Sequence, residues 1–285
     1  MNLRMSLETR IYQKENNTKI GNLFKESIQD IYSSRFLAKQ LAVRDIKAQY
    51  RQSYLGILWA FVTPLTTAFV WMFLNETGTI KLSDTGVPYP VYAFTGTLIW
   101  SIIVDAINSP LNATNGAKGI MSKINFPKEA LIISGIYKLL FNSSVKIILL
   151  VVFVFFYGIG FHPSLLLFPL AILGAIIFGS TLGLFITPIG MLYKDIAKMI
   201  TIGLGLLMYV TPVVYSIPKE GMMKTIMEWN PFTSLILTTR DFVVGTEPIY
   251  LGYFIGIILT CIPLFFIGLL FYRISIPIIV ERMSA

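Results

Sequence analysis

Long uncharged stretches separated by short polar segments are the main pattern of this chain. The uncharged or nearly uncharged stretches cover about residues 55–74, 87–105, 130–158, 165–192, 199–218 and 248–272. A helix needs about 20 apolar residues to cross the hydrocarbon core of a bilayer, and each stretch comes close to or exceeds that length. The pattern predicts an all-α polytopic membrane protein with six transmembrane helices.

A basic segment at residues 35–54 precedes the first apolar stretch. On a helical wheel one stripe of this segment is basic and the adjoining stripe is apolar. The basic stripe contains Arg44, Lys47 and Arg51, and the apolar stripe contains Val43, Ile46, Tyr50 and Tyr54. The pattern predicts an amphipathic helix that lies along a membrane surface before the chain enters the bilayer. A positively charged flank of the first span, with no further role, is the alternative.

Two more segments are too polar or too short to span. Residues 108–128 mix polar residues with Ile120, Met121 and Ile124, which predicts a short helix lying flat. Residues 219–247 contain two short apolar groups separated by Asn230 and Pro231. Asn at a cap followed by Pro is a helix-start signal, so this segment is predicted to form a pair of re-entrant helices on the outer side.

Polar side chains recur every four residues in the third predicted span. They are Ser134, Lys138, Asn142 and Lys146, which share one side of a helix. At a rise of 1.5 Å per residue, Lys146 lies about 12 Å deeper than Lys138. We expect an ammonium group at that depth to face the interior of the helix bundle, with Asp105 as a candidate partner.

Further candidates for a substrate path are aromatic or basic. Tyr92, Trp100, Tyr209 and Tyr215 could line a pore, where rings stack on sugar faces, or could be ordinary interfacial anchors. Lys118, Lys123 and Lys128 could bind a phosphate group or an ATPase. A general excess of positive charge on the cytoplasmic side is the alternative explanation for these lysines.

Composition supports the membrane assignment. The 285 residues are 55% hydrophobic and 13% charged, with a mean hydropathy of +0.70, which is too apolar for a soluble globular domain. The net charge of +8 comes from residues beside apolar stretches, which fits membrane lipids and no nucleic acid. Lysine and arginine gather in residues 1–34 and in the other segments expected to be cytoplasmic. Both the N-terminus and the tail at 276–285 are therefore expected in the cytoplasm.

The chemistry of an enzyme is absent from the pattern. The chain has one histidine, one cysteine and no spacing typical of metal ligands, which predicts neither catalysis nor a metal site. It also lacks the G-x-x-x-x-G-K-[ST] loop that cradles nucleotide phosphates. We therefore expect no cofactor on this chain, and any ATP-driven transport needs an ATPase on another chain.

Four motifs in order resemble the ABC-2 type permeases that export bacterial polysaccharides. Residues 44–65 follow R-D-x-K-x-x-Y-x-x-S-x-L-G-x-x-W-A-x-x-x-P-L, and residues 123–129 follow K-x-x-F-P-x-E. Residues 193–196 are similar to Y-R-D-I, with Lys194 in place of Arg, and residues 230–232 are similar to N-P-[LF]. The resemblance covers about residues 35–275.

This resemblance implies an assembly and a cargo. It implies a homodimer of six-span subunits with two ATPase subunits, which carry ATP and Mg²⁺, in the bacterial inner membrane. The implied cargo is a polysaccharide linked to undecaprenyl pyrophosphate. O-antigen of lipopolysaccharide is the first expectation, and capsule and teichoic acid are alternatives. Two rival functions remain. One is an ATP-independent lipid-glycan flippase or channel, and the other is an exporter of drugs or small lipids.

The resemblance also assigns roles to the matching residues. It implies that the segments at 44–54, 109–129 and 193–198 contact or respond to the ATPase, and that 219–245 closes the pore on the outer side. The implied coupling residues are Arg44, Asp45, Lys47, Arg51, Lys123, Phe126, Pro127, Glu129, Lys194 and Asp195.

Overall fold

The computed structural model describes residues 20–51, 53–78, 86–121, 123–124 and 126–284, and over these residues its regular structure is entirely helical. The α-helices are α1 (Ile20–Ser33), α2 (Arg35–Tyr50), α3 (Trp59–Glu76), α4 (Tyr89–Gly116), α5 (Lys118–Met121), α6 (Glu129–Phe156), α7 (Phe168–Leu192), α8 (Lys194–Leu207), α9 (Met222–Trp229), α10 (Pro231–Val244) and α11 (Leu251–Ser284). Short 3₁₀ helices, η1 (Gly56–Leu58), η2 (Pro163–Leu166) and η3 (Met208–Val210), lie between them.

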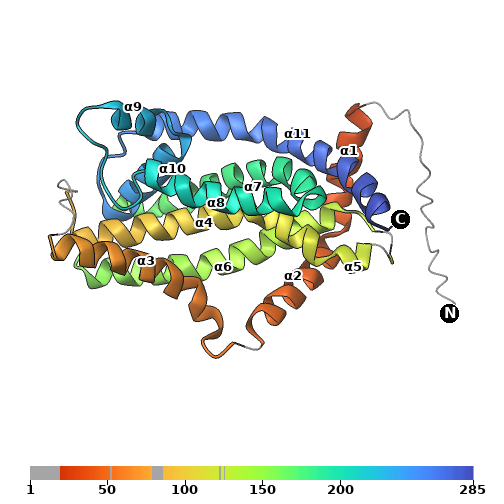
Figure 1. The fold of residues 1–285 in the computed structure, drawn as a ribbon, viewed down its shortest axis with the longest axis horizontal. Coiled ribbons are helices and arrows are strands. Elements are labelled where there is room, and N and C mark those ends of the chain that lie inside the picture. Colours follow the sequence, from red (N-terminus) through yellow and green to blue (C-terminus); the bar gives the residue numbers. More distant parts are fainter. Residues whose placement is uncertain (1–19, 52, 79–85, 122, 125, 285) are drawn as a thin grey trace.

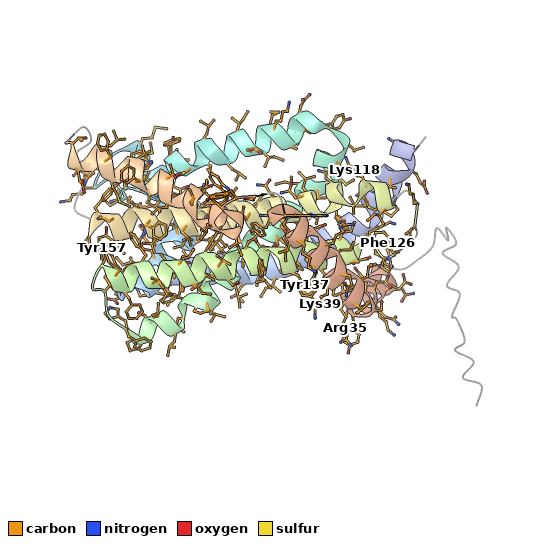
Figure 2. All side chains as sticks on the ribbon, turned by 90° about the horizontal axis from the view of Figure 1, so that it is seen from below. Arg35, Lys39, Lys118, Phe126, Tyr137 and Tyr157 are labelled. Carbon is orange, nitrogen blue, oxygen red and sulfur yellow. The ribbon has the colours of Figure 1, made fainter. Side chains whose placement is uncertain are left out.

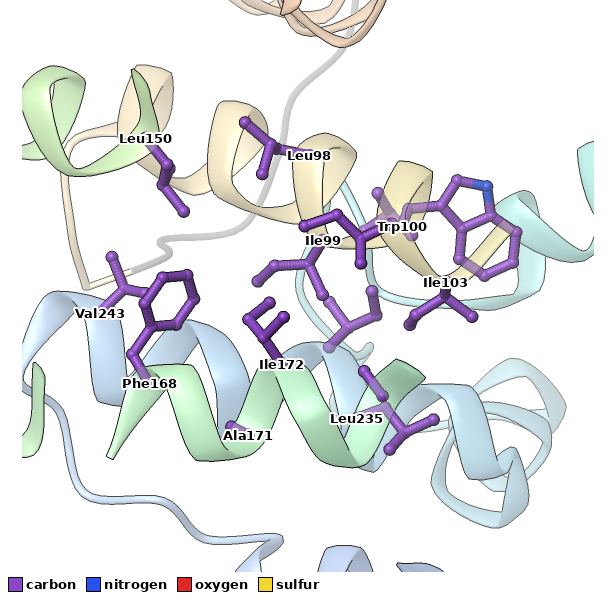
Figure 3. Close-up of a cluster of buried hydrophobic side chains, with 14 of the residues drawn as sticks. Leu98, Ile99, Trp100, Ile103, Leu150, Phe168, Ala171, Ile172, Leu235 and Val243 are labelled. Carbon is purple, nitrogen blue, oxygen red and sulfur yellow. The ribbon is translucent and has the colours of Figure 1, made fainter. Parts of the chain in front are cut away.

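Helix α4 is the centre of the bundle (Figure 1). It packs against α3, α6, α7 and α10. Leu98, Ile99 and Ile103 of α4 meet Ile172 of α7 and Leu235 of α10 in a buried apolar cluster (Figure 3). The core of this protein is therefore built around one helix that is apolar on nearly all sides, as expected for a helix buried inside a membrane domain.

Glycines let α7 approach α4 closely. A Cβ atom built on Gly179 would lie 2.6 Å from the Ala106 Cβ, and one built on Gly183 would lie 2.3 Å from the Ile107 carbonyl oxygen. Any larger side chain at these positions forces the two helices apart. Small residues at helix contacts are typical of membrane domains, because lipid provides little hydrophobic drive for helices to associate.

Within the described residues, four helices are long and apolar enough to cross a bilayer, namely α4, α6, α7 and α11. Exposed apolar side chains such as Ile148 and Val152 on α6 and Leu259 on α11 fit contact with lipid. Helices α3 and α8, with 18 and 14 residues, are not among the four. The all-helical, multi-pass architecture is confirmed, and the count of six spans stays a prediction.

The fifth predicted span, residues 199–218, differs from the helix that forms. Helix α8 starts earlier, at Lys194, and ends at Leu207, and the backbone is extended at Thr211. Pro212 explains the extended backbone at Thr211, because a residue that precedes proline is disfavoured in the α region. We call residues 211–215 the strap.

The polar segment at 108–128 also differs from the expected flat helix. Helix α4 continues through it to Gly116, and only α5 and a short loop follow. Polar side chains within this part of α4 turn back onto the helix, as Asn108 does with the Val104 carbonyl at 2.9 Å and Thr114 with the Pro110 carbonyl at 2.7 Å. Such internal hydrogen bonds let a polar helix end extend the central span.

Helices α1 and α2 lie beside the bundle at the end that carries the C-terminus (Figure 1). Helix α2 packs on α6, and its buried residues are Ala38, Leu41 and Ala42. Val43 and Tyr54, from the predicted apolar stripe, are exposed and do not attach α2 to the bundle. Residues 1–19 of the predicted N-terminal segment lie outside the described residues.

The predicted helix start at Asn230 is confirmed. The Asn230 side chain accepts a hydrogen bond from the Phe232 backbone N–H at 3.0 Å, and Pro231 is the first residue of α10. Helix α9 is amphipathic and largely exposed, but most of α10 is buried, including Thr238 and Arg240. The two helices contact each other, and α10 packs inside the bundle against α4, α7 and α11. Their re-entrant position on the outer side stays a prediction.

Candidate functional site

A polar groove lies between α2, α3, α4 and α6. Helices α2 and α3 form a V on one flank of the bundle (Figure 1). A cavity of about 460 Å³ is lined by these four helices and by Met208 of η3, and one of about 270 Å³ by α2, α4 and α6. Gln49, Asp105 and Asn142 line both cavities. Because they share these residues, we treat the two cavities as one central groove.

The lining of the central groove combines aromatic, neutral polar and charged side chains. The larger cavity contains Trp59 and Trp100, and three threonines. The charged residues of the groove are Asp45, Asp105, Lys138 and Lys146, two acids and two bases. The groove is therefore polar but close to neutral in charge.

Lys146 faces the interior, as the sequence predicts. Its Nζ donates hydrogen bonds to the Asp105 carboxylate at 2.6 Å and to the Ser101 hydroxyl at 3.0 Å. The Lys146 side chain is 5% exposed and that of Asp105 is 47% exposed, because Asp105 opens into the groove. The pair fixes α4 to α6 at the wall of the groove.

Tyr50 connects the end of α2 to the wall of the groove. Its hydroxyl donates to Asn142 Oδ1 at 2.9 Å. Burial raises the pKa of the Tyr50 hydroxyl, and the negative charge of Asp105 raises it further. The hydroxyl therefore stays protonated and keeps its role as donor, so that α2 is tied to α6 beside the Lys146–Asp105 pair.

The structure brings together only some of the residues predicted to form a substrate path. Trp100, Lys138, Asn142 and Lys146 line the central groove. The other members lie elsewhere: Tyr209 and Tyr215 pack near the Trp71 ring, at 6.5 and 6.3 Å between centroids; Tyr92 lies under the Arg240 guanidinium; and Lys118 lies on α5.

A buried charged cluster joins α1, α6 and α11. Arg273 of α11 forms ion pairs with Asp30 of α1 at 2.8 Å and with Glu129 at the first turn of α6. Glu26 pairs with the same guanidinium at 3.3 Å, and Ser27 donates to Glu129 at 3.2 Å. Glu129 is 2% exposed. Its carboxylate is thus occupied within this chain.

The remaining predicted coupling residues lie near the same end or on the outside of α2. Figure 2 shows Arg35, Lys39, Lys118 and Phe126 at the end opposite Tyr157. Arg44 is exposed and bonds its neighbour Asp45 at 2.8 and 2.7 Å. The other exposed members are Lys47, Arg51, Lys123 and Asp195, whereas Pro127 is half-buried and Lys194 is described only in its backbone.

Lys128 lies over a ring in the loop before α6. Its Nζ is 4.5 Å from the centre of the Phe126 ring. Burial lowers the pKa of Lys128, and the adjacent Glu129 charge opposes this shift. The cation–π contact therefore stabilises the conformation of the loop itself just before α6 begins.

Comparison with known proteins identifies the family. Residues 37–241 match the ABC-2 type transporter family. The chain belongs to the ABC-2 type transporter family. A protein of Klebsiella pneumoniae named O-antigen export system permease protein RfbA is 30% identical over 87% of this chain and 98% of its own length. A protein of Myxococcus xanthus with the same name is 26% identical over 73% of this chain and 80% of its own length.

Membership in the ABC-2 type family defines the broad role of the chain. It is a non-catalytic, multi-pass membrane permease whose domain binds no cofactor itself, and an ABC transporter permease implies an ATPase partner. The family match includes the central groove and Glu129 but excludes α1 and α11. Arg273 and Asp30, which hold Glu129, therefore lie outside the matched region.

Sequence reasoning missed two arginines that face the interior, Arg240, which is buried, and Arg273, whose side chain is 16% exposed. Arg273 counts as a tail charge and Arg240 as an outer-loop charge in the sequence pattern, but both are inside the structure. A signal was present for Arg273, an isolated arginine in an apolar stretch, and a weaker one for Arg240, whose only charged neighbour in the surrounding stretch is Asp241. Such a residue in a membrane domain is expected to face inward and to have partners.

Proposed function

We propose that this chain is the permease subunit of an ATP-driven exporter of a lipid-linked polysaccharide, with O-antigen as the first candidate cargo. The central groove is the observation that carries the proposal, because it offers a polar route along helices that are otherwise apolar. The names of the relatives, O-antigen export system permease proteins, support the choice of cargo. We propose undecaprenyl pyrophosphate as the lipid carrier.

The chemistry of the groove favours the sugar part of such a cargo. The exposed ring of Trp59 offers a flat apolar face, and Gln49 and Asn142 offer both donors and acceptors for hydroxyl groups. Pyrophosphate needs cations with free donors. Of the two lysines in the groove, Lys146 is already bonded to Asp105, and Lys138 is a single half-buried cation. We place the pyrophosphate nearer the exposed Lys123 and the half-buried Lys118 at the α5 end.

The assembly proposed here contains two copies of this chain and two ATPase subunits that hold ATP and Mg²⁺. We propose that the complex lies in the bacterial inner membrane with the termini of this chain in the cytoplasm. The exposed basic residues Arg44, Lys47 and Arg51 of the α2 end then face the ATPase or the lipid headgroups. Glu129 takes part in coupling through Arg273 and α1 rather than by direct contact, since its carboxylate is buried.

Export in cells tests the proposal. A bacterium that lacks its own O-antigen permease receives this chain together with the ATPase gene adjacent to it, and surface glycan is measured by labelling intact cells. We expect surface glycan with the intact pair and none when the Walker A lysine of the ATPase is replaced. Glycan that accumulates inside in the presence of both intact subunits contradicts the proposal.

The same experiment separates the rival functions. Surface glycan that persists without a working ATPase supports an ATP-independent flippase or channel. Capsule and teichoic acid are distinguished from O-antigen by the sugar composition of the glycan that reaches the surface. The groove itself is tested by Trp59→Ala, with Trp229→Ala of α9 as the matched control, because both tryptophans are exposed.

A further inference from the structure

Arg240 supplies hydrogen bonds to a stretch of backbone that has left helical geometry. Its Nη1 donates to the Pro212 carbonyl at 3.2 Å, and its Nη2 donates to the Val213 carbonyl at 2.5 Å. Both carbonyls belong to the strap, residues 211–215, which follows η3. Inside a membrane domain such carbonyls need partners from the protein, because no water is at hand to bond them.

Two tyrosines of α4 donate hydrogen bonds to the next two carbonyls of the strap. The Tyr89 hydroxyl donates to the Val214 carbonyl at 3.0 Å, and the Tyr92 hydroxyl donates to the Tyr215 carbonyl at 3.2 Å. Together with the bonds from Arg240, side chains of α4 and α10 satisfy consecutive strap carbonyls from 212 to 215. The strap is therefore attached to two helices by side chains rather than by a backbone ladder.

The burial of Arg240 shows that this arrangement is specific. The residue is 2% exposed, and its guanidinium lies 3.6 Å from the centre of the Tyr92 ring. No ion pair found among the described residues includes it. A buried charge is unfavourable without compensation, so the strap carbonyls, the ring face and the charge of the adjacent Asp241 together stabilise the arginine.

Gly96 of α4 provides the space for this contact. A Cβ atom built there would lie 1.9 Å from the Val213 carbonyl oxygen and 2.1 Å from Arg240 Nη2. Even alanine at this position would displace both the strap and the guanidinium. The contact between Arg240 and the strap therefore requires glycine at position 96 of α4.

The strap lies just beyond the lining of the central groove. Met208, just before it, lines the larger cavity, and Tyr215 within it lies 6.3 Å from the Trp71 ring of α3. Helices α9 and α10 lie at the end of the bundle opposite α1 and the C-terminus (Figure 1). The strap thus joins α3, α4 and α10 beside the groove, towards the end away from α1.

We propose that Arg240 is a positioning residue that holds the strap closed across the far end of the central groove. The bonds to Pro212 and Val213 keep this end sealed, and the strap moves only when the guanidinium leaves them. Helix α8 leads directly into η3 and the strap, and exposes Met199, Ile202 and Leu206, so it is the element placed to pull the strap away. This proposal rests on the proposed function, because a seal has meaning only on a transport path.

Passive leak in liposomes tests the seal separately from export. The permease is reconstituted with its ATPase but without ATP, and the release of a small trapped dye is measured. We expect Arg240→Met to raise the leak rate about tenfold or more, the shift in a closed–open equilibrium that loss of a charge-assisted hydrogen bond produces. Arg240→Lys, which keeps the charge but loses the fork of donors, should leak at an intermediate rate.

If Arg240→Met does not insert into the membrane, the double variant Tyr89→Phe with Tyr92→Phe tests the proposal instead. This double variant removes two donors to the strap but retains both rings, and a raised leak is expected from it as well. Lys224→Met removes an exposed cation of α9 at the same end and is the matched control, with no change in leak expected. A lower unfolding temperature without any increase in leak in the Arg240 and tyrosine variants overturns the proposal. Export that fails in the wild type while these variants leak refutes the proposed function but not the seal.

Discussion

At the scale of single residues, the charges inside this protein are neutralised in different ways. Lys146 has a carboxylate partner in Asp105, Arg273 has three carboxylate partners, and Arg240 has backbone carbonyls and a ring face. Each buried charge needs bonded partners, because the interior stabilises an isolated charge poorly. The partners of each charge therefore determine which other helices or segments its stability depends on.

Replacement of one member of the Lys146–Asp105 pair should be worse than replacement of both. Asp105→Asn leaves the Lys146 ammonium buried without its counter-charge. Loss of one partner of a fully buried pair costs about 3–5 kcal/mol, and the effect here should be smaller because Asp105 is 47% exposed. The measure is the thermal unfolding temperature of the purified permease in detergent.

The double variant Asp105→Asn with Lys146→Met is the matched control for that experiment. It removes the buried charge along with its partner, so its unfolding temperature should lie above that of Asp105→Asn alone. An equal or lower unfolding temperature in the double variant would show that the Lys146 charge is not the source of the instability.

At the scale of elements, α1 and α11 act together on the start of α6. Arg273 reaches from α11 to Glu129 of α6 and Asp30 of α1, so three helices distant in the sequence meet at one guanidinium. The same end of the molecule holds α5 and the loop that contains Phe126 (Figure 2). Force applied to this end is therefore shared among α1, α6 and α11.

Glu129→Gln should weaken this junction without abolishing the fold. The amide keeps the shape of the side chain but loses the charge, and a charge-assisted hydrogen bond contributes about 1.5–3 kcal/mol. Asp30 and Glu26 still pair with Arg273, so we expect a lower unfolding temperature and increased protease cleavage between α1 and α2. Limited proteolysis of membranes measures this, with Glu228→Gln on the exposed α9 as the control. Unchanged cleavage would show that Glu129 does not hold α1.

Helix α2 offers a second element whose attachment can be weakened. Tyr50→Phe removes the hydrogen bond to Asn142 but retains the ring. A neutral hydrogen bond contributes about 1 kcal/mol, so the unfolding temperature should change little while α2 is freed at its end. A spin label at exposed Lys47 should then show greater mobility, and the same label at exposed Lys39, nearer the start of α2, should not. Equal mobility at both sites in the variant and the wild type would contradict this attachment.

At the scale of the whole molecule, basic residues and a polar groove occur together at one part of a largely apolar surface. Arg44, Lys47 and Arg51 are exposed beside the helices that line the groove. In an ABC transporter the ATPase partner acts from outside the membrane domain, and exposed charges near a moving helix are suited to receive that action. The α2–α3 V then connects the surface to the groove.

Reversal of these three charges to Glu should uncouple transport more than it unfolds the protein. The residues are exposed, and exposed charges contribute little to stability, about 0–1 kcal/mol for each pair. We expect a nearly unchanged unfolding temperature but a loss of permease-stimulated ATPase activity in the reconstituted complex. Reversal of Lys219 and Lys224, at the opposite end, serves as the control. Full stimulation in the Glu variant would remove α2 from the coupling route.

The sequence determines the class of architecture because hydrophobic length is a local property. Uncharged stretches long enough for a bilayer predict membrane helices whatever their neighbours, and the Asn230–Pro231 cap is likewise local, since it depends on atoms two residues apart. Lys146 is expected to face inward from the cost of its charge alone. The motifs indicate the ABC-2 type family for the same reason, as they are read directly from the chain.

Tertiary structure decides which of these residues meet. In the sequence, Arg240 is simply a charged residue in a short segment. In the structure, α4 provides the Tyr92 ring and the space at Gly96, and the strap provides carbonyl acceptors. Glu129 matches a family motif, but only the packing of α1 and α11 shows that its carboxylate is engaged within the chain. Such partners are distant in the sequence, and their meeting depends on helix packing and the burial of charge, which no local pattern contains. The sequence by itself determines which side chains must be buried. The tertiary structure decides which residues they contact once they are buried.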